Sequence, residues 1–390
     1  MPISRRTFLG AVATAPFAAG VIWRGAKAPR VAVVGAGAFG GWTALHLRRR
    51  GCPVTLIDAW GPGNTRSSSG GETRVIRAIY GADRIYVAMV KRAYELWEQL
   101  DSSLYTETGV LWLHRGDDAY VRSSLAHLKD FGFPVDQFAL DDAAKRYPQI
   151  DFSGIKSAWL ERRAGVLSAR HACGVVRDAF LKLGGTYRTQ LVQPDTKLDA
   201  DVVVFACGPW LGKLFPEIPI RPTRQEVFYF GTPGGTESFV PPRFPVWIDF
   251  GERIVYGIPD IHSRGFKIAD DTRGETFDPT SGDRTPSADG AARARRVLSE
   301  RFPSMANAPL LAAEVCQYEN SPDGNLIIDQ HPQLKNTWIA GGGSGHGFKL
   351  SPAIGEMLAD AITIGRDLPK PFALDRLKDA KSGTQFERKS

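Results

Sequence analysis

The stretch that decides the fold runs from Arg30 to Trp60 and reads RVAVVGAGAFGGWTALHLRRRGCPVTLIDAW. It begins with an apolar run of strand character, continues through a glycine-rich turn and a helical segment, and ends with a second apolar strand that finishes at Asp58. This order predicts a β-α-β unit of the kind that binds a dinucleotide. We therefore expect a nucleotide-binding domain that begins at residue 30.

Three glycines and one acidic residue of this unit have distinct physical roles. Gly35 permits a tight turn, Gly37 lets the backbone approach a pyrophosphate, and Gly40 lets the helix pack on the strand. The N-terminus of the helix faces the phosphate charge. Asp58 lies where a carboxylate can accept hydrogen bonds from a ribose hydroxyl. The motif does not distinguish NAD from FAD.

Two later segments favour FAD. The run ADVVVFACGPWLGKL predicts a buried strand from Val202 to Ala206 that breaks at Gly208. The run TWIAGGGSGHGFKLSPAIGEMLADAI predicts a strand, a glycine loop and a helix that begins near Ser351. Both segments have the pattern of one nucleotide-binding sheet. Because the two glycine-lined strand ends are far apart in the chain, they fit a large, extended cofactor better than NAD.

The composition is that of an ordinary soluble protein of 390 residues with a net charge of +7. This length favours two domains. Lysine and arginine are spread among the acidic residues, which argues against a nucleic-acid partner. The four cysteines are widely spaced, so we expect free thiols and neither a metal site nor a disulfide framework. They are Cys52, Cys173, Cys207 and Cys316.

The first residues form a separate segment. The charged sequence SRRTFLG is followed by the apolar run AVATAPFAAGVIW. This apolar run is too short to be identified as a membrane-spanning helix. Arg5 and Arg6, followed by Phe8, resemble a twin-arginine export signal. We expect residues 1–29 to be such a signal and the protein to be periplasmic or exported. The alternative is an ordinary N-terminus; an uncleaved segment 1–28 could contact a membrane.

Four further motifs give the sequence a specific resemblance. They are SSSGGETRVIRAIYG at 67–81, YGIPDIHSRGFKIAD at 256–270, CQYENSPDGNLIIDQHP at 316–332 and GSGHGFKLSP at 343–352. Together they resemble the D-amino acid oxidase superfamily of flavoproteins and, within it, the monomeric sarcosine oxidase and N-methyltryptophan oxidase group. The resemblance covers nearly the whole chain after residue 30.

The resemblance implies an α/β fold with a Rossmann-like FAD-binding domain and a discontinuous substrate domain built on a mixed β-sheet. The expected FAD-binding segments are 30–105, 160–220 and 320–385, and the expected substrate segments are 106–159 and 221–319.

Local patterns predict further elements. The run YVAMVKRAYELWEQL predicts a helix from Tyr86. The runs TRQEVFYFGT, FPVWIDFG and RIVYGIP predict strands between residues 220 and 260. The polar, turn-rich stretch 270–290 predicts a mobile surface loop.

The resemblance also implies how the cofactor is bound. Relatives attach the flavin through a thioether between a cysteine at the position of Cys316 and the 8α-methyl group. A thiolate is a suitable nucleophile for that bond, although a free cysteine is more often a small buried apolar side chain. The implied cofactor-binding residues are Gly35, Gly37, Gly40, Asp58, Ser68, Thr73, Arg74, Cys316, Gly345, Gly347 and Lys349.

Two cationic residues stand where relatives bind the substrate carboxylate. These are Arg77 and Lys349, and a guanidinium can neutralise a carboxylate with two parallel hydrogen bonds. In a strand, Arg74 and Arg77 would point to opposite faces, whereas in a helix they would share one. We therefore expect Arg74 to serve the flavin and Arg77 the substrate; the alternative is a solvated pair of arginines.

Two more residues match the resemblance near the flavin. Lys267 lies where the family keeps a lysine that would supply positive charge as dioxygen is reduced. The alternative for Lys267 is an ordinary surface lysine. Tyr256 is expected to line the substrate site, with core packing as its alternative.

The sequence departs from the sarcosine oxidase pattern at two positions. Gly70 and Asp271 stand where close relatives have histidines. Loss of an imidazole at Gly70 would open space, and a carboxylate at Asp271 would favour a cationic substrate tail. Glu319 would add a second acid if it faces the substrate, and Trp247 would narrow the same pocket.

These residues imply an FAD-dependent oxidation of the C–N bond of a secondary amino acid to an imine, with reduction of dioxygen to hydrogen peroxide. We expect a larger N-substituted or cyclic amino acid, with a basic side chain, rather than sarcosine. The catalytic candidates are Lys267, Arg77, Lys349 and Tyr256, and the protein is expected to be a monomer. The alternative is an exported flavin dehydrogenase that passes electrons to a quinone or carrier.

Overall fold

The computed structural model describes residues 28–235, 237–378 and 382–386. The expected export signal therefore lies outside the described residues, apart from its last two positions. Within the described ranges, no helix combines the length and the apolar character needed to cross a membrane.

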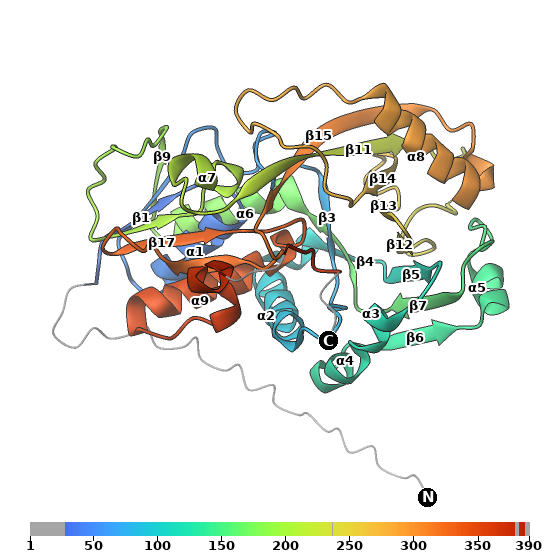
Figure 1. Cartoon of the computed structure of the whole chain (residues 1–390), viewed down its shortest axis with the longest axis horizontal. Helices are drawn as coiled ribbons and strands as arrows, with labels where there is room; N and C mark the ends of the chain where they lie inside the picture. Colours follow the sequence, from blue (N-terminus) through green and yellow to red (C-terminus); the bar gives the residue numbers. More distant parts are fainter. Residues whose placement is uncertain (1–27, 236, 379–381, 387–390) are drawn as a thin grey trace, which may run out of the picture.

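A six-stranded sheet contains the predicted β-α-β unit (Figure 1). Strand β1 pairs in parallel with β2 on one side and with β10 on the other, and helix α1 connects β1 to β2. The sheet order is β16, β17, β10, β1, β2, β9, and only β16 is antiparallel to its neighbour. The strands are β1 (Val31–Val34), β2 (Val54–Asp58), β9 (Thr186–Thr189), β10 (Val202–Phe205), β16 (Ile327–Gln330) and β17 (Thr337–Gly341). The predicted nucleotide-binding unit and its two later strands are confirmed.

Helices from distant parts of the chain cover this sheet. Helix α1 contacts both α9 and α6, and Figure 1 shows α1 and α9 side by side. Trp42 of α1 is fully buried and meets Trp97 of α2 edge to face, with ring centroids 5.0 Å apart. The helices are α1 (Ala38–Arg49), α2 (Arg84–Asp101), α6 (Ala169–Lys182) and α9 (Ser351–Ile364). The predicted helices from Tyr86 and near Ser351 are confirmed.

A second, eight-stranded sheet forms the other half of the molecule. Its order is β15, β11, β14, β13, β12, β5, β7, β6. Strands β12 and β5 are parallel and the remaining pairs are antiparallel, so the sheet is mixed as predicted. The strands are β5 (Val110–His114), β6 (Val135–Phe138), β7 (Ser157–Glu161), β11 (Arg221–Phe230), β12 (Val246–Phe250), β13 (Ile254–Ile258), β14 (Phe266–Asp270) and β15 (Leu310–Asn320).

A small sheet links the two halves in the order β3, β8, β4. Its strands are β3 (Thr73–Ile76), β4 (Tyr105–Glu107) and β8 (Gly165–Ser168). The remaining helices are α3 (Ala119–Arg122), α4 (Leu125–Phe131), α5 (Leu140–Arg146), α7 (Leu211–Leu214) and α8 (Ala288–Arg301). Short 3-10 turns lie at Ser102–Leu104, Gly208–Trp210, Pro303–Met305, Phe348–Leu350, Lys370–Phe372 and Leu374–Lys378.

The strands follow the expected division of the chain. Those of the six-stranded sheet all fall in the segments expected to bind FAD, and most of the eight-stranded sheet falls in the substrate segments. The domain bounds themselves stay a prediction. The predicted α/β fold class is confirmed.

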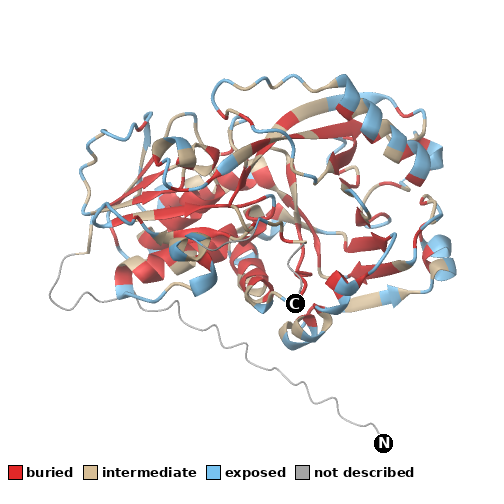
Figure 2. Cartoon of the chain, in the orientation of Figure 1, coloured by how far each residue is buried: buried red, intermediate tan, exposed pale blue. Residues whose placement is uncertain are grey.

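One expectation for the second half is wrong. Trp247 does not narrow the substrate pocket, because it is fully buried in a separate aromatic core. Its ring centroid lies 4.9 Å from that of Phe302 and 6.2 Å from that of Phe266. Figure 2 shows how buried residues fill the strands of both sheets.

The stretch 270–290 is irregular up to α8, as predicted, but it is anchored to its surroundings. Phe277 is 5% exposed. Asp278 forms a 2.6 Å ion pair with Lys213, and the Thr280 hydroxyl accepts a hydrogen bond from Trp210. These contacts bring the stretch against the large cleft described next.

Candidate active site

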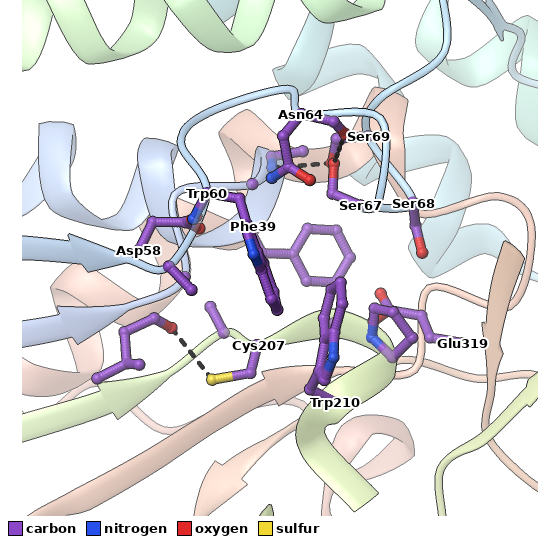
Figure 3. Close-up of a pocket in the computed structure, with 18 of the residues that line it drawn as sticks. Phe39, Asp58, Trp60, Asn64, Ser67, Ser68, Ser69, Cys207, Trp210 and Glu319 are labelled. Atoms are coloured by element: carbon purple, nitrogen blue, oxygen red, sulfur yellow. Dashed lines mark hydrogen bonds between the residues drawn. The ribbon is translucent and has the colours of Figure 1, made fainter. Parts of the chain in front are cut away.

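A large cleft opens where strands β1, β2 and β10 end, and its cavity volume is about 430 Å³. This is the edge at which parallel α/β sheets bind their ligands. Figure 3 shows side chains from several segments around it. Of the predicted cofactor-binding residues, those that line the cleft are Gly35, Gly37, Asp58, Ser68, Arg74, Gly345 and Gly347.

The glycines of the first turn stand where side chains would collide. Gly35 has a φ of +103°, and a Cβ there would lie 2.3 Å from the carbonyl oxygen of Ala206. Gly40 does not line the cleft; a Cβ there would lie 1.8 Å from the carbonyl oxygen of Gly35. The close approach of α1 to β1 and β10 therefore depends on both residues lacking a side chain.

Asp58 organises the floor of the cleft. Its Oδ2 accepts a hydrogen bond from the backbone N–H of Ala36 at 2.7 Å. Its Oδ1 accepts from the backbone N–H groups of Trp60 and Gly61 at 2.8 and 2.7 Å. A carboxylate has further lone pairs, so Asp58 can hold the turn and still accept a hydroxyl hydrogen bond.

Polar atoms inside the cleft fit a bound polar ligand. The Ser68 hydroxyl and Glu319 Oε2 are buried without a hydrogen-bond partner among the described residues. The other Glu319 oxygen accepts from the N–H of Gly343 at 3.3 Å, and burial raises the pKa of Glu319 to about 7. Buried polar atoms are rarely left unpaired. The cleft therefore suits a large ligand with several hydroxyl or amide groups, such as FAD.

Glu319 corrects one sequence expectation. It lines the large cleft and not the second, smaller cavity described below, which contains Asp271. It therefore does not add a second acid beside Asp271.

Aromatic rings that the sequence reasoning missed also line the cleft. Trp60 and Trp210 have ring centroids 4.9 Å apart, and Figure 3 shows both rings near Phe39. Flat apolar faces of this kind can pack against a planar ring system. Trp60 lies two residues after Asp58, and Trp210 lies in the GPW turn after β10. These positions at the ends of two strands of the nucleotide-binding sheet could have indicated that both rings line the cleft.

A second cavity of about 60 Å³ adjoins the large cleft. The two share Arg74, Tyr318, Gly345 and Phe348. The residues found only in the smaller cavity include Arg77, Tyr256, Asp271, His346, Lys349, Gln385 and Phe386. The structure thus brings together Arg77, Lys349 and Tyr256, three of the four predicted catalytic residues.

Arg77 and Lys349 are buried cations that face one ring. The guanidinium carbon of Arg77 lies 4.9 Å and the Lys349 Nζ lies 5.2 Å from the centre of Tyr80. Lys349 donates to the carbonyl of His346 at 3.0 Å. Burial, together with the neighbouring Arg77, holds the pKa of Lys349 well below its usual value. An anion that entered this cavity would be strongly favoured beside both groups.

Arg74 lies where the two cavities meet. It donates to the carbonyl oxygens of Thr73 and Ser68 at 2.8 and 2.7 Å and to the Cys316 sulfur at 3.4 Å. It lines both cavities, whereas Arg77 lines only the smaller one, and the division of roles between the two arginines stays a prediction. Strand β3 ends at Ile76, one residue before Arg77, so the alternation of a strand does not by itself fix the direction of the Arg77 side chain.

Asp271 has a partner that sequence reasoning missed. The Tyr318 hydroxyl donates to Asp271 Oδ1 at 2.6 Å, and burial raises the pKa of Asp271 to about 6. Gly70, by contrast, opens no space in this cavity. A Cβ at Gly70 would lie 2.0 Å from the carbonyl oxygen of Asn64, so that position is filled by backbone.

Lys267 lies beside the cavities without lining them. It is 2% exposed, and its Nζ donates to the carbonyl of Thr73 at 3.2 Å. Burial, and then the nearby Arg74, lower the pKa of Lys267 to about 7. The surface alternative for Lys267 is therefore wrong. The hydroxyl of Thr73 is buried without a partner among the described residues.

All four cysteines are free, as predicted. Cys316 is half-buried and lines neither cavity, although Gln317 and Tyr318 beside it line the cleft. In the described ranges, no group of three or more His, Cys, Asp or Glu side chains could hold a metal ion.

Comparisons with known proteins agree with this geometry. Residues 30–361 match the DAO family, described as FAD dependent oxidoreductase. Monomeric sarcosine oxidase of Arthrobacter sp. (strain TE1826) is 32% identical over 86% of this chain and 92% of the relative. N-methyl-L-tryptophan oxidase of Escherichia coli (strain SMS-3-5 / SECEC) is 28% identical over 84% and 93%.

Solved structures share the fold. L-proline dehydrogenase from P. horikoshii has a TM-score of 0.77 at 23% identity and covers 91% of this chain and 99% of its own. Fructosamine oxidase from Aspergillus fumigatus (Amadoriase II) has a TM-score of 0.72 at 23% identity and covers 89% and 88%.

Proposed function

Because this chain belongs to the DAO family of FAD dependent oxidoreductases, we propose that it oxidises the C–N bond of a secondary amino acid to an imine and passes the electrons to dioxygen. It is an FAD-dependent amino acid oxidoreductase. Two relatives are named for sarcosine and N-methyl-L-tryptophan, and both compounds are N-methyl amino acids. The observation that carries the proposal is the cavity with Arg77 and Lys349 beside the large cleft.

The chain's own residues bind and orient the substrate. FAD, when bound in the large cleft, accepts the two electrons of the amine oxidation. Arg77 and Lys349 neutralise the substrate carboxylate, which directs the amine toward the part of the cavity shared with the cleft. A carboxylate next to Lys349 also favours its protonated form. Both side chains are buried, and the lower local polarity strengthens their attraction for a carboxylate.

Asp271 supports a substrate with a basic tail. Its carboxylate lies in the same cavity as the two cations, and a cationic side chain would pair with it. A panel of sarcosine, N-methyl-lysine, N-methyl-arginine, pipecolate and N-methyltryptophan tests this, with kcat/KM as the measurement. We expect the basic substrates to have the highest values. A value for sarcosine far above the others would contradict the role of Asp271.

Flavin reduction and reoxidation test the reaction as a whole. The purified protein should be yellow, and its visible absorbance should bleach when a good substrate is added without oxygen. Air should then restore the colour and release hydrogen peroxide. Reduced flavin that persists in air would favour the dehydrogenase alternative, and no bleaching with any member of the panel would contradict the proposal.

Cys316 is our candidate for covalent attachment. Its sulfur accepts a hydrogen bond from an Arg74 nitrogen at 3.4 Å, and Arg74 also lines the large cleft. Cys207 is a matched control because it lines the cleft, but burial raises the pKa of its thiol and keeps it protonated. After acid precipitation, the yellow colour should stay with the wild-type and Cys207→Ser pellets and move to the supernatant in Cys316→Ser. Colour in every supernatant would contradict attachment.

Export and monomeric state complete the proposal. Arg5 and Arg6 support a twin-arginine signal. A reporter fused to residues 1–29 should leave the cytoplasm, and Arg5→Lys with Arg6→Lys should retain it.

Light scattering on the purified protein should give the mass of one chain, and a mass of two chains would contradict the monomer.

A further inference from the structure

The C-terminal residues 382–386 lie against the smaller cavity. The carbonyl of Gly383 accepts a hydrogen bond from Arg273 at 2.8 Å, and its N–H donates to the carbonyl of Pro322 at 3.0 Å. Gly324 allows a close approach, because a Cβ there would lie 3.2 Å from the backbone nitrogen of Gln385. The segment is therefore docked on two separate loops.

Two side chains of this segment cover Arg77. Gln385 is 4% exposed, and its Oε1 accepts a hydrogen bond from Arg77 Nη2 at 3.0 Å. Phe386 packs on Tyr120 and Phe250, with ring centroids 5.3 and 5.4 Å away. The Arg77 guanidinium carbon lies 5.4 Å from the centre of the Phe386 ring.

The Gln385 amide therefore occupies a position that suits a substrate carboxylate. A side-chain amide oxygen presents the same acceptor to a guanidinium as one carboxylate oxygen does. The free volume left in the cavity, about 60 Å³, corresponds to about two water molecules at the density of the liquid. An amino acid with both an N-substituent and a side chain needs more room, so Gln385 has to move when such a substrate binds.

We propose that Gln385 is a specificity-determining residue, whose amide holds Arg77 until a carboxylate displaces it. The inference rests on the proposed role of Arg77 as the carboxylate-binding group. A carboxylate adds opposite charge to the hydrogen bond and can accept two parallel hydrogen bonds from a guanidinium, whereas the Gln385 amide offers one neutral acceptor oxygen. A carboxylate can therefore replace Gln385, whereas a neutral amine or amide of the same size competes poorly. The site thereby rejects amines that lack a carboxylate.

Binding of acetate to the FAD-loaded protein tests this without turnover. The dissociation constant is measured from the change in the visible absorbance of the bound flavin, with acetamide as the neutral analogue. In Gln385→Ala the competitor is gone, so acetate should bind about fivefold more tightly. In Gln385→Glu the new carboxylate of residue 385 itself binds Arg77, so acetate should bind at least about tenfold more weakly. Acetamide should bind wild type more weakly than acetate does.

The kinetic readout should follow the same order. For the best substrate, KM should fall in Gln385→Ala and rise in Gln385→Glu, while kcat stays within about twofold. A purely structural role would weaken both variants alike. Equal weakening of acetate binding in both, or no change in either, would overturn the proposal, and so would a wild-type protein that binds acetamide as well as acetate.

Matched variants guard against misfolding. Gln330 is exposed at the end of β16, so Gln330→Ala and Gln330→Glu repeat the same chemical changes away from the cavity and should leave acetate binding unchanged. Deletion of residues 382–390 should reproduce the tighter acetate binding of Gln385→Ala; weaker binding would count against the proposal. If acetate binding follows the expected order but no amine is oxidised, the proposed function fails while this inference stands.

Discussion

At the scale of single residues, burial shifts the pKa values of several ionisable groups near the two cavities toward neutral pH. It lowers the pKa of Lys267 to about 7 and raises those of Asp271 and Glu319 to about 6 and about 7. These shifts arise because a charge loses hydration when its side chain is buried. Small changes of pH or of bound ligand can therefore change the charge of the site.

Lys267→Met should slow the reaction with oxygen and leave flavin reduction intact. The ammonium would stabilise the negative charge that develops on dioxygen, so its loss should slow reoxidation about 10²-fold. Because its pKa is about 7, wild-type reoxidation should also slow as the pH rises through that value. Stopped-flow measurements of anaerobic bleaching and of reoxidation separate the two steps. Lys213→Met, at the cleft and paired with Asp278, is the control; equal reoxidation rates in both variants would refute the role of Lys267.

Asp271→Asn should remove the preference for a basic substrate. The carboxylate is charged above a pKa of about 6 and neutral below it. In wild type, kcat/KM for N-methyl-lysine relative to sarcosine should therefore rise as the pH increases from 5 to 7. In the variant this ratio should be about tenfold lower and independent of pH. Asp270→Asn is the matched control, since Asp270 pairs with Arg253 outside this cavity. A ratio unchanged in Asp271→Asn would refute the assignment.

At the scale of secondary structure, the first turn places α1 so close to β1 that only glycine fits. Gly40→Ala should destabilise the protein by about 3 kcal/mol, because the new methyl group collides with backbone that cannot yield. Gly174 provides a control within a helix, because a Cβ there meets nothing within 4 Å. Gly174→Ala should stabilise by about 0.5–1 kcal/mol. Urea denaturation measures both, and equal effects would show that the packing argument is wrong.

The sequence predicted the positions of helices and strands better than it predicted which cavity their side chains face. Strand β15, which carries Cys316 and Glu319, was not predicted from the sequence; the family motif marked only the residues from Cys316 onward. Which cavity each residue faces follows from the antiparallel pairing of β15 with β11, in which Cys316 lies opposite Gln225. That register depends on contacts between distant segments, so the local pattern did not reveal that Glu319 faces the large cleft.

At the scale of the whole molecule, a bound cofactor would connect elements from both ends of the described chain. The large cleft takes residues from β1, β2, β10 and the loop after β17. A ligand that binds only this assembled form stabilises it. Folding and cofactor binding are therefore expected to be coupled.

FAD should raise the melting temperature of Cys316→Ser protein from which the cofactor has been removed. At about 100 times the dissociation constant, the stabilisation should be about 2.7 kcal/mol, a shift of a few degrees that grows with FAD concentration. Differential scanning fluorimetry can follow it. NAD at the same concentrations is the control and should give no shift. A larger shift with NAD would contradict the choice of FAD.

The sequence by itself determined the β-α-β unit, its glycines, the strands and helices that follow a clear local pattern, and the family, because each depends on local periodicity or on a short motif. It also singled out Arg77 and Lys349. Only the tertiary structure decided that Trp247 belongs to a core, that Tyr318 binds Asp271, and that Gln385 reaches Arg77. The physical reason is that these contacts join residues far apart in the chain, and only packing and strand register bring their side chains together.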